Sequence, residues 1–331
     1  MRAPHLEDGE VIEVRRGFFW ITGERVATPT GLVMAGPMHV EWEAPARPTE
    51  LPPLVLVHGG GGQATDWWGT PDGRPGWARR FVDAGHPVYV IDRPGHGRSP
   101  HHPDVLGRPG PQFSYEAARF VFVPALEEAP DHTEWPWSRD PGGEELDQFM
   151  CGVSFQSEDI AAAQLREAER LGRLLERVGP AVLVTHSAGA PCGWIAANEH
   201  PGLVRALVAI EPQSPPFSSR SGIGDMEWGI TRAPIRYDPP ASSPDELERP
   251  LPGRRLPGLV GLDVAVVTGG ASAWFRETAP QMVEFLRDAG AHAEHLDLAA
   301  HGVLGNGHAI MLERNSDEAI VPVLAWIREH G

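Results

Sequence analysis

The sequence predicts an α/β fold with a mostly parallel central sheet flanked by helices, and three observations support this prediction. Short, wholly apolar runs alternate along the chain with amphipathic segments of helical period, as buried parallel strands and their covering helices do. The region before them alternates apolar and polar residues, as antiparallel strands do. Two long segments rich in Pro, Gly, Ser and Trp interrupt the alternation, and we expect them to form cap or lid insertions.

Each expected element follows from its local pattern. The antiparallel region covers residues 11–16, 18–22 and 38–43. The apolar runs of the parallel sheet are residues 54–57, 88–91, 181–184, 203–210, 262–267 and 293–298. Residues 157–178 carry apolar side chains at spacings of three and four, with Arg and Glu on the other face, which predicts a helix. Further helices are expected at residues 77–84, 188–200, 279–289 and 317–329.

We expect residues 1–331 to form a single domain, with insertions at residues 100–156 and 212–258. Each insertion follows the carboxyl end of an expected strand, which is the edge where open α/β sheets place their ligands. Residues 127–159 contain ten acids and one base, Arg139. That charge either forms a solvated surface or makes a cap that disfavours anionic substrates.

The charge balance and the absence of lysine exclude several classes of protein. Acidic residues outnumber basic ones 45 to 28, a formal net charge of −17. Nucleic acid is therefore not an expected partner, because such a protein repels polyanions. All the basic residues are arginine, so the chain lacks the lysine of Schiff-base enzymes, of Walker-type phosphate loops and of Ser-Lys dyads.

The termini and cysteines indicate a cytoplasmic protein without a membrane partner. Residues 1–10 are too charged for a signal peptide, and no apolar run reaches the ~20 residues that span a bilayer. Cys151 and Cys192 lack the spacing of a zinc or redox site, and free thiols are favoured over a bridge between them. The histidines show no metal-site spacing, so we expect neither a metal nor a cofactor.

Residues 181–190 run from an expected strand directly into an expected helix, and Ser187 stands at the turn. This is the context of a nucleophile elbow, in which a tight turn holds a serine oxygen above the sheet. The usual form is G-x-S-x-G, and here Thr185 replaces the first glycine. The replacement is tolerable if the backbone stays near β geometry, although the motif alone leaves a chance match open.

A second motif is the run of four glycines at residues 59–62, after an apolar strand. Glycines let the backbone approach a ligand, so this loop could supply one oxyanion donor beside the N–H that follows the nucleophile. A nucleotide site is disfavoured because Ala64 stands at the third fingerprint position. Residues 92–99 have a D-x-x-G-x-G-x-S pattern, in which we expect Ser99 to fix a loop because no helix follows it.

A serine hydroxyl needs a neighbouring base to become a nucleophile. His308 lies in a Gly-rich loop between the last expected strand and the closing helix, where the chain order Ser, acid, His places the base. His301 is the alternative in the same loop. His186 adjoins the serine, but on a sharp turn its side chain should point elsewhere.

The carboxylate that orients the base is expected at Glu211. Residues 268–272, after the seventh strand, contain no acid. Glu211 instead ends the apolar strand before it, where an unpartnered carboxylate would be costly. A solvent-facing Glu211 is the other interpretation, and Asp263 begins its strand and so belongs to the opposite edge of the sheet.

These motifs resemble those of the α/β-hydrolase superfamily and, more narrowly, of a small group of bacterial carboxylesterases whose acid is a Glu after the sixth strand. The resemblance covers roughly residues 18–329 and is carried by residues 38–42, 68–77, 185–187, 210–212 and 305–308. It implies a homodimer, Ser187 as nucleophile, His308 as base and Glu211 as acid, with the N–H groups of Gly60 and Ala188 as oxyanion donors. That group has adjacent cysteines where Gly60 and Gly61 stand here, so no redox feature carries over.

The sequence as a whole favours a serine hydrolase that cleaves a small-molecule carboxylic ester through an acyl-enzyme intermediate. We expect aromatic residues near the oxyanion loop or in the second insertion to line its pocket, or else to serve as core packing: Trp67, Trp68, Phe217 and Trp228. The alternatives are an amide or lactone hydrolase, a lyase on the same scaffold, and a non-catalytic ligand-binding protein.

Overall fold

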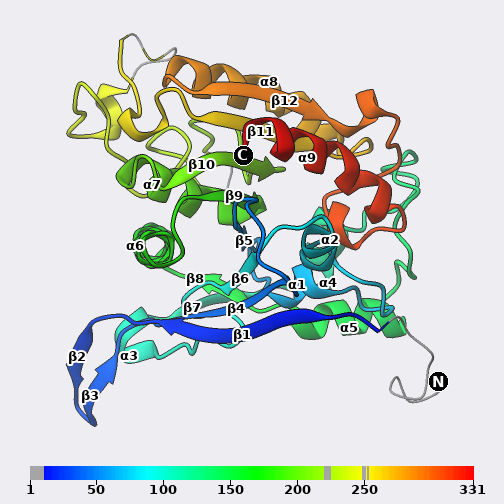
Figure 1. The fold of residues 1–331 in the computed structure, drawn as a ribbon, viewed down its shortest axis with the longest axis horizontal. Helices are drawn as coiled ribbons and strands as arrows, with labels where there is room; N and C mark the ends of the chain where they lie inside the picture. Colours follow the sequence, from blue (N-terminus) through cyan, green and yellow to red (C-terminus); the bar gives the residue numbers. More distant parts are fainter. Residues whose placement is uncertain (1–10, 220–224, 248–250, 252) are drawn as a thin grey trace.

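Eight strands form one central sheet, in the order β1-β4-β6-β5-β9-β10-β11-β12 (Figure 1). The structure is a computed structural model that describes residues 11–219, 225–247, 251 and 253–331. The strands are β1 (Val14–Ile21), β4 (Met38–Pro45), β5 (Leu54–Val57), β6 (Val88–Asp92), β9 (Ala181–His186), β10 (Val204–Ile210), β11 (Asp263–Thr268) and β12 (His292–Asp297).

The sheet is antiparallel at one edge and parallel elsewhere. β4 pairs antiparallel with both β1 and β6, whereas every pair from β6 to β12 is parallel. The carboxyl ends of β5, β9, β10 and β11 therefore meet at one edge of the sheet. The expected α/β-hydrolase architecture is confirmed.

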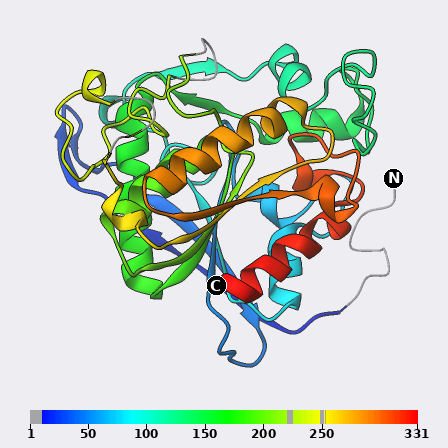
Figure 2. The ribbon, with the colours of Figure 1, turned by 90° about the horizontal axis from the view of Figure 1, so that it is seen from above.

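Helices cover both faces of the sheet and enclose a hydrophobic core on each side (Figures 1 and 2). One face carries α6 (Ile160–Val178), α7 (Ala190–Glu199) and α8 (Ala273–Asp288), and the other carries α2 (Trp77–Asp83) and α9 (Ser316–His330). Alternate residues of β10 enter opposite cores, Leu207 on one side and Val208 on the other, as the strand period of two requires.

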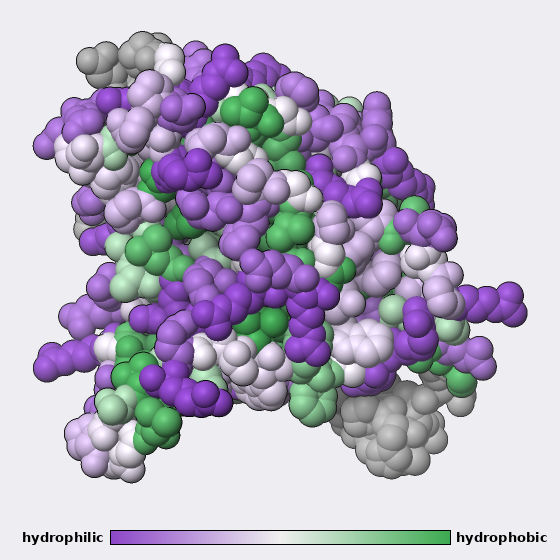
Figure 3. Space-filling view, turned by 60° about the vertical axis from the view of Figure 1, so that its left-hand side comes forward, coloured by the Kyte–Doolittle hydropathy of each residue, from purple (hydrophilic) through white to green (hydrophobic). Residues whose placement is uncertain are grey.

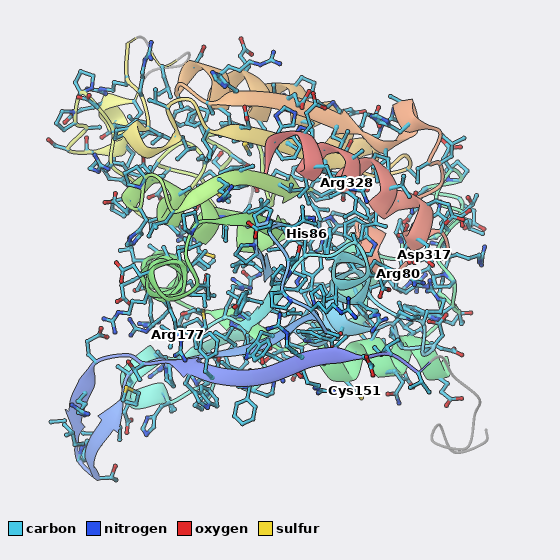
Figure 4. The ribbon with its side chains drawn as sticks, in the orientation of Figure 1. Arg80, His86, Cys151, Arg177, Asp317 and Arg328 are labelled. Atoms are coloured by element: carbon cyan, nitrogen blue, oxygen red, sulfur yellow. The ribbon has the colours of Figure 1, made fainter. Side chains whose placement is uncertain are left out.

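An ion pair and a cation–π contact join elements on the outside of these cores. Arg80 of α2 and Asp317 of α9 face each other (Figure 4), with Nη2 2.7 Å from Oδ2. Arg177 of α6 lies over the ring of Phe19 in β1, 3.8 Å from its centre. On the face of the described residues in Figure 3, hydrophobic side chains form small separate patches among hydrophilic ones.

The first insertion contains only short elements. These are α3 (Pro103–Leu106), β7 (Pro109–Gln112), α4 (Tyr115–Val121), α5 (Glu144–Gly152) and β8 (Phe155–Ser157). In the second insertion, the described part has 3₁₀ turns at Pro244–Glu246 and Pro257–Leu259. Its side chains Ile230, Ile235 and Tyr237 pack into the core of α6, α7 and α8.

Several boundaries differ from the sequence expectation. In place of two strands at 11–16 and 18–22 there is one continuous strand, β1 (Val14–Ile21), and a β2–β3 hairpin (Arg25–Thr28 and Gly31–Met34) lies between β1 and β4. α6 begins only at Ile160, because Asp159 caps it by accepting from the Ala162 N–H. α8 begins six residues earlier than expected, at Ala273 rather than 279, and contains Pro280.

The structure bears on the expectations about membrane segments and about the two cysteines. The expectation that residues 1–10 carry no signal peptide lies outside the described residues. Within the described ranges, no helix has the length and apolarity to cross a bilayer. Cys151 is an exposed free thiol and Cys192 a buried one.

Candidate active site

Ser187 stands at a sharp turn between β9 and α7. Its φ of 49° is left-handed, a conformation that costs a non-glycine residue about 1–3 kcal/mol and collects at functional sites. A 3₁₀ turn, Ser187–Gly189, leads into α7. A side chain at Gly189 would come within 2.4 Å of the His58 carbonyl oxygen, so this turn requires glycine there. The half-buried Ser187 is thereby presented above the sheet.

Thr185, in place of the usual first glycine, keeps extended geometry as the last pair of β9 with β5. The close approach between strand and helix is made instead by Gly193 of α7, where an added Cβ would lie 2.8 Å from the Thr185 methyl carbon. A residue without a side chain is therefore needed at position 193, where α7 packs beside Thr185.

His308 lies beside Ser187, with 3.0 Å between its Nε2 and the serine Oγ. Its ring stacks on Phe275 at 4.4 Å with an interplanar angle of 4°, and packs against Phe122 at 5.2 Å. His186 also touches the ring, and its Nε2 bonds to the His308 carbonyl oxygen at 3.0 Å. The imidazole is thus held in one plane, with its Nε2 facing the hydroxyl.

Glu211 lies on the other side of His308, with its Oε2 2.7 Å from Nδ1. It directly follows β10, the sixth strand of the main sheet in chain order, and is fully buried. Its Oε1 accepts the Gly269 N–H at 2.7 Å. Its own φ is 43°. Glu211 is therefore a buried, partnered carboxylate, and the solvent-facing alternative is wrong.

Burial governs the protonation of this pair. It lowers the pKa of His308. It raises the pKa of Glu211, although hydrogen bonds from Gly269 and Ser272 act in the opposite direction. Because the two groups share a hydrogen bond, they titrate as a unit. A neutral imidazole that donates Nδ1–H to Glu211 leaves its Nε2 free to accept the serine proton.

The glycine loop lies against the elbow. A Cβ added to Gly60 would be 3.2 Å from the Cβ of Ala188, so the two backbones run side by side. Gly61 has a φ of 67°, and its carbonyl oxygen accepts the Ser154 N–H of the first insertion at 2.7 Å. The loop is therefore held against both the turn at Ser187 and the first insertion.

A cavity of about 370 Å³ opens above Ser187, His308, Gly60 and Ala188. Its apolar wall comes from the first insertion and from the start of α8: Phe113, Phe120, Val121, Phe122, Pro124, Ala129, Ala271, Ala273, Trp274 and Phe275. The glutamines Gln156 and Gln213 add polar groups.

The four aromatic residues expected to line this cavity do not line it, and the expectation is corrected. Trp67 is fully buried against Trp77 beneath the glycine loop, and Trp68 packs against the same core. Phe217 packs on Phe285, and Trp228 belongs to the core on the opposite face of the sheet. Proximity along the chain to a motif did not predict proximity in space.

The alternative residues lie away from the site. His301 ends a 3₁₀ turn and is exposed, and Asp263 pairs with His292 at the opposite edge of the sheet. Ser99 is buried, accepting the His39 N–H at 2.8 Å and bonding to the Asp92 carbonyl oxygen at 2.6 Å. It therefore fixes a loop, as expected.

A second buried His–Glu pair adjoins the His308 loop and was not found from the sequence. Glu313 accepts the Gly307 N–H at 2.9 Å and bonds to His132 Nε2 at 2.8 Å. His132 comes from the first insertion, and both side chains are at most 2% exposed. The signal is weak in the sequence because these residues lie 181 positions apart.

Comparison with known proteins agrees with the fold. Residues 52–228 match the family described as alpha/beta hydrolase fold, and the chain belongs to this family. It is 33% identical over 319 residues to a protein named "Probable secreted lipase phiG" from a fungal species, covering 88% of this chain and 86% of the relative. A solved structure described as a novel bacterial esterase is 23% identical, with a TM-score of 0.71 over 98% of both chains.

Proposed function

We propose that this protein is a serine hydrolase that cleaves carboxylic esters through an acyl-enzyme intermediate. The observation that carries the proposal is His308, whose two ring nitrogens lie 3.0 Å from Ser187 Oγ and 2.7 Å from Glu211 Oε2. This is the arrangement of nucleophile, base and orienting acid. It opens into a cavity large enough for a small ester.

In the first half-reaction, Ser187 Oγ attacks the acyl carbon while its proton passes to His308 Nε2. The imidazolium that forms is stabilised by the Glu211 carboxylate at Nδ1. The carbonyl oxygen becomes an oxyanion and accepts hydrogen bonds from the N–H groups of Gly60 and Ala188. His308 then returns the proton to the leaving alcohol, and the acyl group stays on Ser187.

In the second half-reaction, a water molecule takes the place of the alcohol. His308 removes its proton, the hydroxide attacks the acyl carbon, and the same two N–H groups hold the second oxyanion. Collapse of this intermediate releases the carboxylic acid. The proton on His308 returns to Ser187 Oγ, so the enzyme ends in its starting state.

The cavity favours an uncharged ester with an apolar portion. Its wall is largely aromatic and aliphatic, and the described residues that line it include no Asp, Glu or Arg. The similarity to the fungal protein named as a lipase supports an ester substrate. The match to the solved bacterial esterase supports the fold that presents the site.

Hydrolysis of p-nitrophenyl esters of graded acyl length tests the proposal. We expect turnover by the wild type, an optimum acyl length set by the cavity, and loss of turnover in Ser187→Ala. The corresponding p-nitroanilides and lactones, assayed in parallel, separate ester from amide or lactone hydrolysis. A protein that binds these esters with no turnover above the Ser187→Ala background would contradict the proposal and indicate a ligand-binding protein.

We also propose that the two insertions form a cap over the site and that the chain is a homodimer. Apolar residues of the first insertion supply much of the cavity wall, which supports a cap. The second proposal follows from the resemblance to the bacterial esterase group. The cytoplasmic location stays a prediction, since the name of the fungal relative describes that protein as secreted.

A further inference from the structure

Arg93 is a buried cation directly behind the glycine loop. It follows β6 within the D-x-x-G-x-G-x-S motif, and its side chain is 4% exposed. Its Nη1 lies 3.2 Å from both carboxylate oxygens of Glu167 on α6. This contact neutralises the guanidinium charge but leaves Nη2 free for another acceptor.

That acceptor is the carbonyl oxygen of Gly59, 2.6 Å from Nη2. The backbone N–H of Arg93 donates to His58 Nε2 at 3.0 Å, so the ring of His58 carries its proton on Nδ1. Nδ1 lies 2.9 Å from the same Gly59 oxygen. The Gly62 N–H adds a longer bond to this oxygen, at 3.4 Å, so three donors converge on one carbonyl, one of them charged. Nη1 also lies 3.4 Å from the carbonyl oxygen of Ala188.

The Gly59 carbonyl belongs to the same peptide unit as the Gly60 N–H. This unit is planar and trans, so its C=O and N–H point in opposite directions. Because Arg93 holds the Gly59 carbonyl in place, it also fixes the direction in which the Gly60 N–H points on the cavity side. A charge-assisted hydrogen bond to the carbonyl also polarises the amide and strengthens its N–H as a donor.

We propose that Arg93 is a positioning residue for the oxyanion site: it orients and polarises the peptide unit whose N–H, on Gly60, receives the developing negative charge. The inference rests on the proposed serine-hydrolase function. Glu167 acts as its anchor, because it holds the guanidinium in the one position from which Nη2 reaches Gly59. Arginine suits this role because its planar fork serves two acceptors at once.

The test compares two variants, one that lacks the guanidinium of Arg93 and one that retains it. Arg93→Met/Glu167→Gln removes the cation and its anchor together, so no buried charge is left unpaired. Glu167→Gln alone keeps the guanidinium, and the amide oxygen of the substituted side chain can still accept from Nη1 and hold Nη2 on Gly59. Arg170→Met is the matched control, because Arg170 is an equally buried arginine of α6 that pairs with Glu24 rather than with the loop.

Each variant is assayed for kcat and KM with a p-nitrophenyl ester and for the affinity of a trifluoromethyl ketone. The ketone adds to Ser187 as a tetrahedral oxyanion, so its affinity reports the oxyanion site, whereas a purely structural role would not move it selectively. Removing an oxyanion donor costs about 10²- to 10³-fold in kcat. For a donor that is weakened rather than removed, we expect kcat and ketone affinity of the double variant to fall about 30-fold relative to Glu167→Gln, with KM changed less than threefold. Arg170→Met should keep both.

A folded double variant with kcat and ketone affinity within threefold of Glu167→Gln would overturn the inference. If the double variant does not fold, Arg93→Lys replaces it, because its single ammonium group pairs with Glu167 or with Gly59 but not with both. A fall of at least fivefold in kcat and ketone affinity is then expected, and unchanged values would overturn the inference. Retention of turnover in Ser187→Ala would instead refute the proposed function.

Discussion

Ser187 and Glu211 both have left-handed backbone conformations, with φ of 49° and 43°. Neither is a glycine, and each stands at the carboxyl end of a strand, β9 and β10. Strain of this kind persists where the surrounding structure over-determines it. Here it aims a hydroxyl and a carboxylate at the two nitrogens of one imidazole, His308.

At the residue scale, the first prediction concerns the nucleophile and the base. Ser187→Ala and His308→Ala should each abolish nearly all ester turnover and leave the protein folded. Because such residues act as a unit, the double variant should be little worse than either single variant. Steady-state kinetics with circular dichroism measure both points. Ser187→Ala activity within tenfold of the wild type would remove the nucleophile assignment.

The second prediction concerns Glu211. Glu211→Gln keeps the shape but places a donor or a neutral acceptor opposite Nδ1, so the imidazole loses its preferred tautomer. We expect kcat to fall by ~10³ to 10⁴. Asp263→Asn and Glu277→Gln, the latter at an exposed position of α8, are the controls and should change kcat little. Should one of these controls lose activity while Glu211→Gln retains it, the acid has been assigned to the wrong strand.

At the scale of elements, the parallel strands could be predicted because burial on both faces makes them short, wholly apolar runs. The segment 54–57 coincides with β5. The order Ser187, Glu211, His308 could be predicted because each residue directly follows a strand or lies in the loop before the last helix. The short elements of the first insertion could not be predicted, because segments of three to nine residues are too short to carry a reliable periodicity.

The residues of the cavity wall could not be predicted from the sequence either. Phe122 and Phe275 lie 153 positions apart and meet only across the ring of His308, at 5.2 and 4.4 Å. No local pattern marks such residues. The same holds for the contact between His132 and Glu313, which ties the first insertion to the loop of His308.

That contact gives the third prediction. Glu313→Ala would leave the buried Gly307 N–H and His132 Nε2 without an acceptor, a loss that typically costs ~2–4 kcal/mol of stability. We expect a lower free energy of unfolding in urea and a lower kcat, because the loop of His308 loses its support. Glu318→Ala, at an exposed position in the first turn of α9, is the control and should change neither quantity.

At the scale of the whole molecule, the acidic surface and the apolar cavity are separate features. Residues 127–159, with ten acids and one base, carry more than half of the net charge of −17, whereas the described residues that line the cavity include no Asp or Glu. We therefore expect the charge to affect solubility and association and the apolar cavity wall to select the substrate.

The fourth prediction is the oligomeric state. We expect a homodimer at micromolar concentration, with a mass twice that of the 331-residue chain. Most soluble oligomers pair about a two-fold axis. Size-exclusion chromatography with light scattering measures the mass directly. A monomer across the micromolar range would refute this prediction and leave the site unaffected.

The central claim is that Ser187 is an activated nucleophile, and covalent labelling with a fluorophosphonate tests it most directly. Intact-mass spectrometry followed by peptide mapping should show one adduct per chain, on Ser187, formed together with the loss of esterase activity. Labelling should be abolished in Ser187→Ala and strongly slowed in Glu211→Gln. An unlabelled wild type, or an adduct on another serine such as Ser99 with Ser187 unmodified, would contradict the account.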